Sequence, residues 1–163
     1  MMSWLPTPLL RVAYRLAHQL RHRWRKFRGK PIVGVTMIAR DLDGRLLLVR
    51  HSYGPDEWTF PAGGPHRGED YLATAARELM EEVGCRASAL RMIGTIEETM
   101  SGCAHTSHIV ACVTTDAPRP NGHELLEARF FPTHSLPHPL SPRADARLAL
   151  WSARNEARLD PAS

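Results

Sequence analysis

Cysteine is scarce in this chain of 163 residues: Cys85, Cys103 and Cys112 are odd in number and lack CxxC spacing. A disulfide framework and a structural zinc site are therefore not expected, and free thiols suit the reducing cytoplasm. Internal repeats and low-complexity tracts are also absent. A chain of this length can instead bury a sizeable hydrophobic core as a single domain.

Long apolar runs are missing as well, and no small-residue cleavage site follows an apolar stretch. Neither a transmembrane segment nor a secretory signal is predicted. Acidic residues are absent from residues 1–30, which hold eight Lys and Arg. The rest of the chain carries 13 basic and 17 acidic residues, so the basic character of the protein belongs to its N-terminus.

That N-terminal segment is predicted to form a basic amphipathic helix over residues 1–30, ahead of a domain over residues 31–163. Within residues 8–28 the apolar face carries Leu9, Ala13, Leu16, Ala17, Leu20, Trp24 and Phe27, and another face carries Arg11, Arg15, His18, His22, Arg25 and Lys26. Three interpretations stay open: packing on its own domain or on the mate of a homodimer, peripheral contact with an anionic inner-membrane surface, and nucleic-acid contact, which is the least favoured.

A second helix is predicted from about Tyr71 to Val83, where apolar residues recur every three or four positions. The expected buried face carries Leu72, Ala76, Leu79 and Val83. The expected opposite face carries Glu78, Glu81 and Glu82. Three neighbouring carboxylates repel one another, so a positive group is expected among them, and oxygen ligands suit Mg²⁺ or Mn²⁺ better than zinc.

A run of glutamates is more often a solvated helix face than a metal site. The upstream sequence favours the metal site, because Gly63 and Gly64 allow the backbone to approach a phosphate closely. Gly68 adds a turn before Asp70, which is placed to cap the helix. A glycine-rich loop that leads into a carboxylate-bearing helix predicts a site for a metal-bound pyrophosphate.

Residues 63–85 resemble the Nudix box, G-x5-E-x7-R-E-U-x-E-E-x-G-U, in which U is aliphatic. Gly63, Glu69, Arg77, Glu78 and the residues up to Gly84 match every charged and glycine position, and only Cys85 replaces the usual aliphatic residue. A buried thiol is a small hydrophobic group that fills such a place. The number of specified positions at fixed spacing makes this motif far more specific than a short glycine pattern.

The flanking sequence extends the resemblance over about residues 31–155. Residues 33–38 and 45–51 read as a hairpin around an Asp/Gly turn, and 58–64 resemble the family's W-x-L-P-G-G segment. Further strands are predicted at 91–95, 107–115 and 128–131, and a terminal helix at 144–158. The resemblance implies an α/β fold, an α/β/α sandwich around a mixed β-sheet.

The resemblance also implies a Mg²⁺-dependent (or Mn²⁺-dependent) hydrolase that cleaves the pyrophosphate bond of a nucleoside diphosphate linked to another group. Glu78 and Glu82 would be the main metal ligands, with Glu81 and the carbonyl of Ala62 completing the set. Glu69 and Arg77 would form a structural ion pair, and Gly84 would end the box. The implied catalytic residues are Glu78, Glu81 and an auxiliary glutamate.

For that auxiliary role we expect Glu124, with Glu127 as the nearest alternative and Glu97 and Glu98 as more distant ones. The expected substrate contacts are Gly63, Gly64, Arg50 and His66. His51 also lies near the site in sequence, whereas His105 and His108 read as polar residues of a loop that leads into a strand.

Two functions from different classes remain: a pyrophosphohydrolase, and a nucleotide-binding module that keeps the fold without turnover. The complete set of carboxylates favours the hydrolase. Subgroups specific for ADP-ribose or dinucleoside polyphosphates tend to carry Pro or Tyr some fifteen to eighteen residues after the box, and residues 99–103 contain neither. The nucleotide substrate therefore stays open.

Overall fold

The computed structural model describes residues 32–100, 102–122 and 124–159. The N-terminal helix predicted over residues 1–30 lies outside these ranges, and so does the boundary predicted at residue 31. In the described ranges no helix combines the length and apolar character needed to cross a bilayer.

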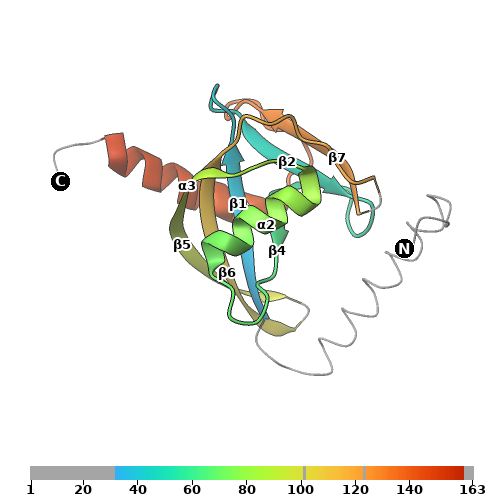
Figure 1. The fold of residues 1–163 in the computed structure, drawn as a ribbon, viewed down its shortest axis with the longest axis vertical. Helices are drawn as coiled ribbons and strands as arrows, with labels where there is room; N and C mark the ends of the chain where they lie inside the picture. The colour runs from blue at the N-terminus through green and yellow to red at the C-terminus, as the bar shows by residue number, and fades with distance from the viewer. Residues whose placement is uncertain (1–31, 101, 123, 160–163) are drawn as a thin grey trace.

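A mixed β-sheet of seven strands forms the centre of the domain (Figure 1). Its strands are β1 (Ile32–Arg40), β2 (Leu46–His51), β3 (Trp58–Thr59), β4 (Ala62–Gly63), β5 (Ser88–Met100), β6 (Cys103–Val113) and β7 (Leu125–Phe131). The order is β3-β2-β1-β6-β5, with β4 paired to β1 and β7 to β2. Only β1 and β6 pair in parallel, from Ile32 opposite His105 to Arg40 opposite Val113. All other pairs are antiparallel.

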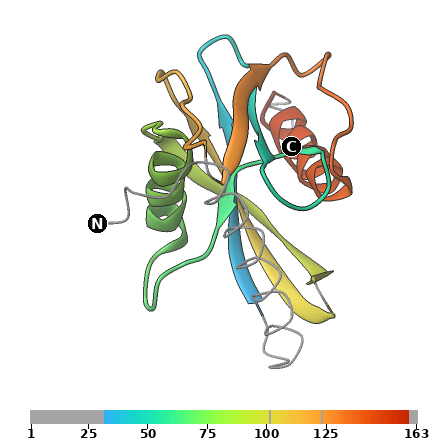
Figure 2. The same cartoon turned by 90° about the vertical axis from the view of Figure 1, so that its right-hand side faces the viewer.

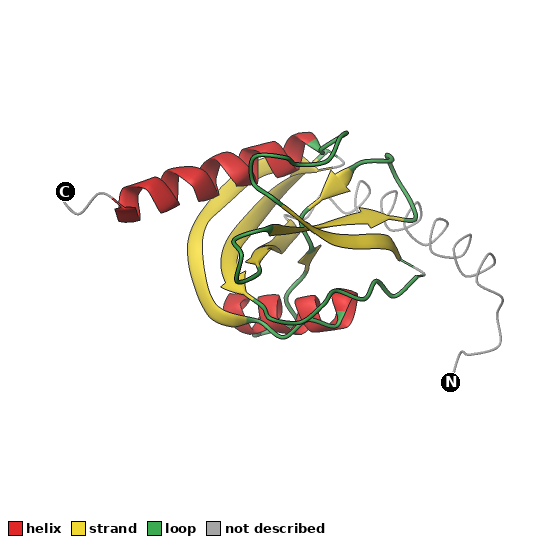
Figure 3. Cartoon of the chain, turned by 90° about the horizontal axis from the view of Figure 1, so that it is seen from above, coloured by secondary structure: helices red, strands yellow, loops and turns green. Residues whose placement is uncertain are grey.

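Two helices cover the two faces of this sheet, α2 (Tyr71–Val83) on one and α3 (Pro142–Leu159) on the other (Figures 2 and 3). The expected α/β/α sandwich is therefore confirmed. Side chains along β1 point alternately to the two faces of the sheet and so contribute to a hydrophobic core on each face. Val35 and Met37 pack with Leu79 of α2, whereas Ile38 packs with Ala144 of α3. Successive strand residues point to opposite faces, so one strand can serve two hydrophobic layers.

The elements predicted after residue 31 occur, although several are longer than their sequence signals. The hairpin turns at Gly44, whose φ of 78° is the left-handed conformation that glycine adopts without strain. Strand β5 continues to Met100 and pairs with β6 along its length, with two register shifts. Sequence windows miss such extensions because cross-strand pairing, and not local propensity, holds the ends.

The interpretation of His105 and His108 as loop residues is wrong, since both lie within β6. His105 is 6% exposed, and its Nδ1 lies 2.9 Å from Oε1 of Glu98. His108 stacks on the ring of Tyr71 at the start of α2, with centroids 3.8 Å apart. Their three-residue spacing in a strand sends the side chains to opposite faces, so the two histidines do not converge.

Candidate metal and phosphate site

Local capping sets the position of α2 relative to the loop before it. The side chain of Asp70 accepts hydrogen bonds from the backbone N–H groups of Leu72 and Ala73, which confirms it as the N-cap. At the other end Gly84 adopts φ of 67° and its N–H closes the last turn. The box therefore begins in a loop, runs through one capped helix and ends one residue after the glycine that stops this helix.

The buried face of α2 differs from the prediction in one respect that matters for the site. Ala75, Leu79 and Val83 are fully buried, and Glu82 is buried with them at 8% exposure. The expectation that Glu82 lies on the face opposite the core is wrong. Helical geometry explains this, because residue 82 is one turn from 79 and adjacent to 83.

Arg77 is the positive group among the carboxylates of the described residues. Its Nε and Nη2 donate to the two oxygens of Glu69, each at 2.9 Å, and Nη2 also donates to the carbonyl of Gly64 at 3.0 Å. Its Nη1 donates to Glu78 at 2.9 Å and to Glu81 at 3.1 Å. Hydrogen bonds, chiefly those from Arg77 and then that from the backbone of His66, lower the pKa of Glu69 to about 2. The predicted pair of Glu69 and Arg77 is thus present, and it ties the loop to the helix.

Gly63 lets Glu78 reach the sheet. A methyl group placed on Gly63 would lie 2.0 Å from Cδ of Glu78, well inside van der Waals contact. Gly63 itself is held opposite Val35 by the pairing of β4 with β1. The close approach of this carboxylate to the strand therefore requires glycine at position 63.

Glu82 carries the strongest electrostatic signal of the site. Burial, together with the nearby charges of Glu124 and Glu78, raises its pKa to about 8, although a hydrogen bond from the Ala62 backbone opposes the rise. Its Oε2 is buried and has no hydrogen-bond partner among the described residues. An orphaned buried carboxyl oxygen beside other carboxylates is the environment that a bound cation would satisfy.

Glu124 joins this group from the segment before β7. Its Oε1 accepts a hydrogen bond from the hydroxyl of Tyr53 at 2.8 Å, and its backbone carbonyl accepts one from the N–H of Ser52 at 2.8 Å. Glu127 is engaged elsewhere, because it pairs with Arg50 and Arg129. Of the two glutamates, Glu124 is therefore the one that acts electrostatically on Glu82.

The expected substrate contacts lie around the same glycine-rich loop and strand β2. Arg50 pairs with Glu127 and Asp56, and its guanidinium lies 5.8 Å from the ring centroid of Trp58. His66 is exposed, and its backbone N–H donates to Glu69 at 2.8 Å. The ring of His51 lies 5.0 Å from that of Tyr53.

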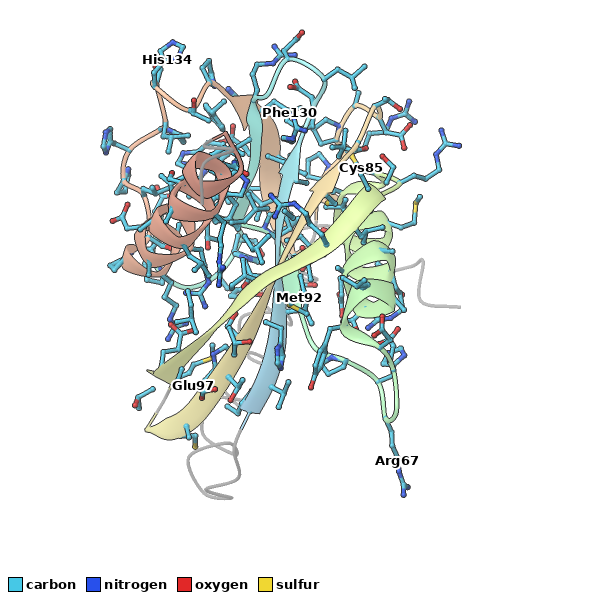
Figure 4. All side chains as sticks on the ribbon, turned by 90° about the vertical axis from the view of Figure 1, so that its left-hand side faces the viewer. Arg67, Cys85, Met92, Glu97, Phe130 and His134 are labelled. Atoms are coloured by element: carbon cyan, nitrogen blue, oxygen red, sulfur yellow. The ribbon has the colours of Figure 1, made fainter. Side chains whose placement is uncertain are left out.

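The two distant alternatives for the auxiliary glutamate lie elsewhere. Glu98 pairs with Arg147 of α3 at 2.6 Å and with His105, on the face away from α2. Glu97 accepts a hydrogen bond from Thr106 at 2.8 Å and lies toward the free end of the β5–β6 hairpin (Figure 4). Neither belongs to the cluster around Glu82.

The described residues contain no group of three His, Cys, Asp or Glu side chains already converged for a metal ion. The reason is visible in the contacts of Arg77, which draws Glu78 and Glu81 toward its own guanidinium. The donor set nevertheless fits a hard divalent cation: carboxylates of Glu78, Glu82 and Glu124 and a backbone carbonyl at Ala62.

Sequence reasoning missed Tyr53, which holds Glu124, and Asp56, which pairs with Arg50. Both lie in the irregular segment between β2 and β3, where no period marks a residue as functional. The one available signal was the position of Tyr53, two residues after β2.

Comparison with known proteins decides the family. The model of the NUDIX domain matches residues 30–151, which is most of the chain. The chain belongs to the NUDIX domain family. The solution structure of the E. coli ORF135 protein is similar to this NUDIX domain with a TM-score of 0.63 and 27% identity, covering 82% of this chain and 96% of that one.

Curated relatives match parts of the domain. The RNA pyrophosphohydrolase of Teredinibacter turnerae is 37% identical over 68 residues, which is 42% of this chain and 39% of the relative. The ADP-ribose pyrophosphatase of Mycobacterium tuberculosis is 37% identical over 95 residues, 55% of this chain and 45% of the relative. The chain thus matches less than half the length of either relative.

Proposed function

We propose that this NUDIX domain is a Mg²⁺-dependent pyrophosphohydrolase that acts on a nucleoside diphosphate linked to another group and releases a nucleoside monophosphate or phosphate. The observation that carries the proposal is Glu82, a buried carboxyl with an orphaned oxygen beside Glu78 and Glu124. The matched relatives that are named as pyrophosphohydrolase and pyrophosphatase support the same reaction class.

Glu78, Glu82 and the carbonyl of Ala62 would hold the cation, and Glu81 would complete its shell. When bound, Mg²⁺ would neutralise charge on the pyrophosphate and activate water for attack at phosphorus. Glu124 orients the attacking water and accepts its proton, with the carboxylate itself positioned by Tyr53.

The glycine-rich loop and strand β2 serve the substrate. Gly63 and Gly64 bring backbone close to the phosphates, and Arg50 and His66 supply positive or hydrogen-bonding groups. Arg77 and Glu69 keep loop and helix in register, because one guanidinium binds Glu69 with two parallel hydrogen bonds and also the carbonyl of Gly64. The assembled site favours an in-line displacement at a pyrophosphate.

A substrate screen tests the proposal directly. The full chain is incubated with Mg²⁺ and, in turn, ADP-ribose, nucleotide sugars, dinucleoside polyphosphates, oxidised nucleoside triphosphates and 5′-triphosphate RNA, and the products are measured. We expect release of nucleoside monophosphate or phosphate from at least one of these substrates, and none when EDTA replaces Mg²⁺.

Variants assign the reaction to the site. Glu78→Gln and Glu82→Gln should each lower turnover by orders of magnitude, because each removes a charge from the metal shell at constant volume. Glu97→Gln is the matched control, since Glu97 lies on the β5–β6 hairpin and should keep wild-type turnover. Wild-type rates in Glu78→Gln would disprove the catalytic assignment, and binding of nucleotide without any turnover would favour the non-catalytic module.

A further inference from the structure

A cavity of about 680 Å³ lies on the face of the sheet that α3 covers. Small-molecule sites in proteins span roughly 300–1,000 Å³, so this volume is large enough for a ligand of nucleotide size. Its lining comes from the ends of β1 and β6, the turn between β1 and β2, the start of β5 and the second half of α3.

The cavity is separate from the glutamate cluster. None of its lining residues belongs to the proposed metal or phosphate site. Alternation along β1 explains the separation, because Ile38 packs on the α3 side, whereas Val35 and Met37 pack under α2. Figure 2 shows the two helices on opposite sides of the sheet, so the two sites face in different directions.

The charge of the lining favours an anion. Among the described residues that line it, Arg40 and Arg91 are charged, and none is Asp or Glu. Arg91 donates to Oδ1 of Asn155 at 3.0 Å, which orients its guanidinium within the cavity wall. No ion pair or hydrogen bond of the Arg40 side chain is found in the described part of the chain, and this side chain is exposed. Arginine forks bind phosphate oxygens with two parallel hydrogen bonds.

The remaining lining favours a planar ring. Trp151 contributes the aromatic surface, and Ile38, Ala111 and Val113 contribute an apolar floor. A phosphate alone would leave this surface unused, whereas a nucleobase would cover it and could also meet the amide of Asn155. The basic N-terminal segment is a poor occupant, since residues 1–30 hold eight Lys and Arg and no acidic residue.

We propose that this cavity is a second, non-catalytic site that binds a nucleoside monophosphate, with the phosphate at Arg40 and Arg91 and the base against Trp151. The lining of the cavity by itself favours a planar anion. The choice of a nucleoside monophosphate rests on the proposed function, because this compound is a product of the proposed reaction.

Titration of the full chain with AMP, followed by NMR of the tryptophan indole N–H groups in EDTA, tests the proposal. Trp151 lines this cavity and reports on it. The Trp151 signal is assigned with Trp151→Phe. We expect that signal to shift saturably with AMP, and adenosine and inorganic phosphate to bind at least tenfold more weakly.

Arg40→Ala should weaken the AMP affinity seen at Trp151 by roughly tenfold or more, because a charge-assisted hydrogen bond is lost. Arg40 is exposed, so this variant should keep the wild-type melting temperature. Arg119→Ala, which removes another exposed arginine outside the cavity, is the matched control and should bind as the wild type does.

Three results would overturn the proposal: a Trp151 signal that AMP does not shift, an affinity at Trp151 that Arg40→Ala leaves unchanged, or inorganic phosphate bound as tightly as AMP. The measurement needs no turnover. If the substrate screen fails but AMP still shifts the Trp151 signal saturably, only the proposed reaction is refuted. If the enzyme is active but AMP does not shift the Trp151 signal, only the second site is refuted.

Discussion

Individual carboxylates of this domain experience very different environments although they lie within two turns of one helix. Glu81 is exposed and reaches Arg77, Glu78 is held against Gly63, and Glu82 is buried with a raised pKa. A single charged side chain can change the pH dependence of the whole fold when its pKa differs between the folded and unfolded states.

The free energy of unfolding of the metal-free protein should fall as pH rises from about 5 to about 8. The ordinary pKa of a Glu side chain, 4.5, applies to Glu82 in the unfolded state, whereas its pKa is about 8 in the folded state, so in this window the folded state binds more protons. The Glu82→Gln variant lacks this titrating group, so its free energy of unfolding should not show this pH dependence. Near pH 8 in EDTA the variant should be more stable than the wild type by on the order of 1 kcal/mol or more. Urea denaturation in EDTA across this range measures the difference.

The control for that measurement is Glu97→Gln, which should keep the wild-type pH slope because its carboxylate is not buried. Added Mg²⁺ should restore stability to the wild type near pH 8, since a cation that binds only the folded state stabilises it. Parallel pH profiles for the wild type and Glu82→Gln would contradict the buried-carboxyl account.

Tyr53 should act on catalysis through Glu124. Tyr53→Phe removes the hydroxyl that donates to Oε1 of Glu124 at 2.8 Å. We expect kcat to fall roughly tenfold with KM within about twofold, the pattern of an interaction that matters mainly in the transition state. In a Glu124→Gln background the same change should add little, because the two residues act as one unit.

Tyr71→Phe is the control, since it keeps the ring that stacks on His108. An unchanged kcat in Tyr53→Phe would assign no role to the hydroxyl.

At the scale of elements, the loop of β4 and helix α2 form one unit. Arg77 joins them through Glu69 and the Gly64 carbonyl, and Glu78 crosses from the helix to Gly63. The site therefore depends on how closely the strand and the helix approach each other. Adding one methyl group at position 63 tests this distance.

Gly63→Ala should abolish most activity while costing little stability. The added Cβ would meet the flexible end of Glu78, which can swing away from the strand but then leaves its proposed metal position. Glu97→Gln is the control, because Glu97 is exposed and bonded to Thr106, away from this loop. Mg²⁺ affinity by calorimetry and turnover should both drop in Gly63→Ala. Adding Gly63→Ala to Glu78→Gln should change turnover little, and a further large loss would contradict the mechanism.

At the scale of the whole molecule, the apolar face predicted for residues 8–28 needs a cover. Leu16, Leu20, Trp24 and Phe27 in water would form a patch that soluble monomers avoid. We favour packing on the domain or on a dimer mate over a membrane surface.

Deletion of residues 1–29 should therefore lower the melting temperature or cause aggregation, and the intact protein should not bind anionic vesicles. Thermal melting, light scattering and vesicle sedimentation measure these outcomes. The opposite result is a stable, active truncated domain together with vesicle binding that salt weakens, since screening removes contacts between arginine and lipid. That combination would establish membrane docking instead.

Much of the site could be read from sequence because its residues follow one another along a single capped helix and the loop before it. Asp70 and Gly84 sit at the two ends of the helix, so local spacing was sufficient to place them, whereas the role of Arg77 came from the resemblance to the Nudix box. Local spacing also predicted that Glu78 lies outside the hydrophobic core. It could not reveal that Glu82 is buried, because that depends on which flank of the helix the sheet covers.

The amino-acid sequence by itself determined the sandwich fold, the order of its elements and the family to which the box belongs. Only the tertiary structure decided that Tyr53 holds Glu124, that Glu98 turns away to Arg147, and that Arg40 and Trp151 share a cavity. The physical reason is separation along the chain: hydrophobic period and capping act within a few residues, whereas these contacts join segments that only the packing of the sheet brings together.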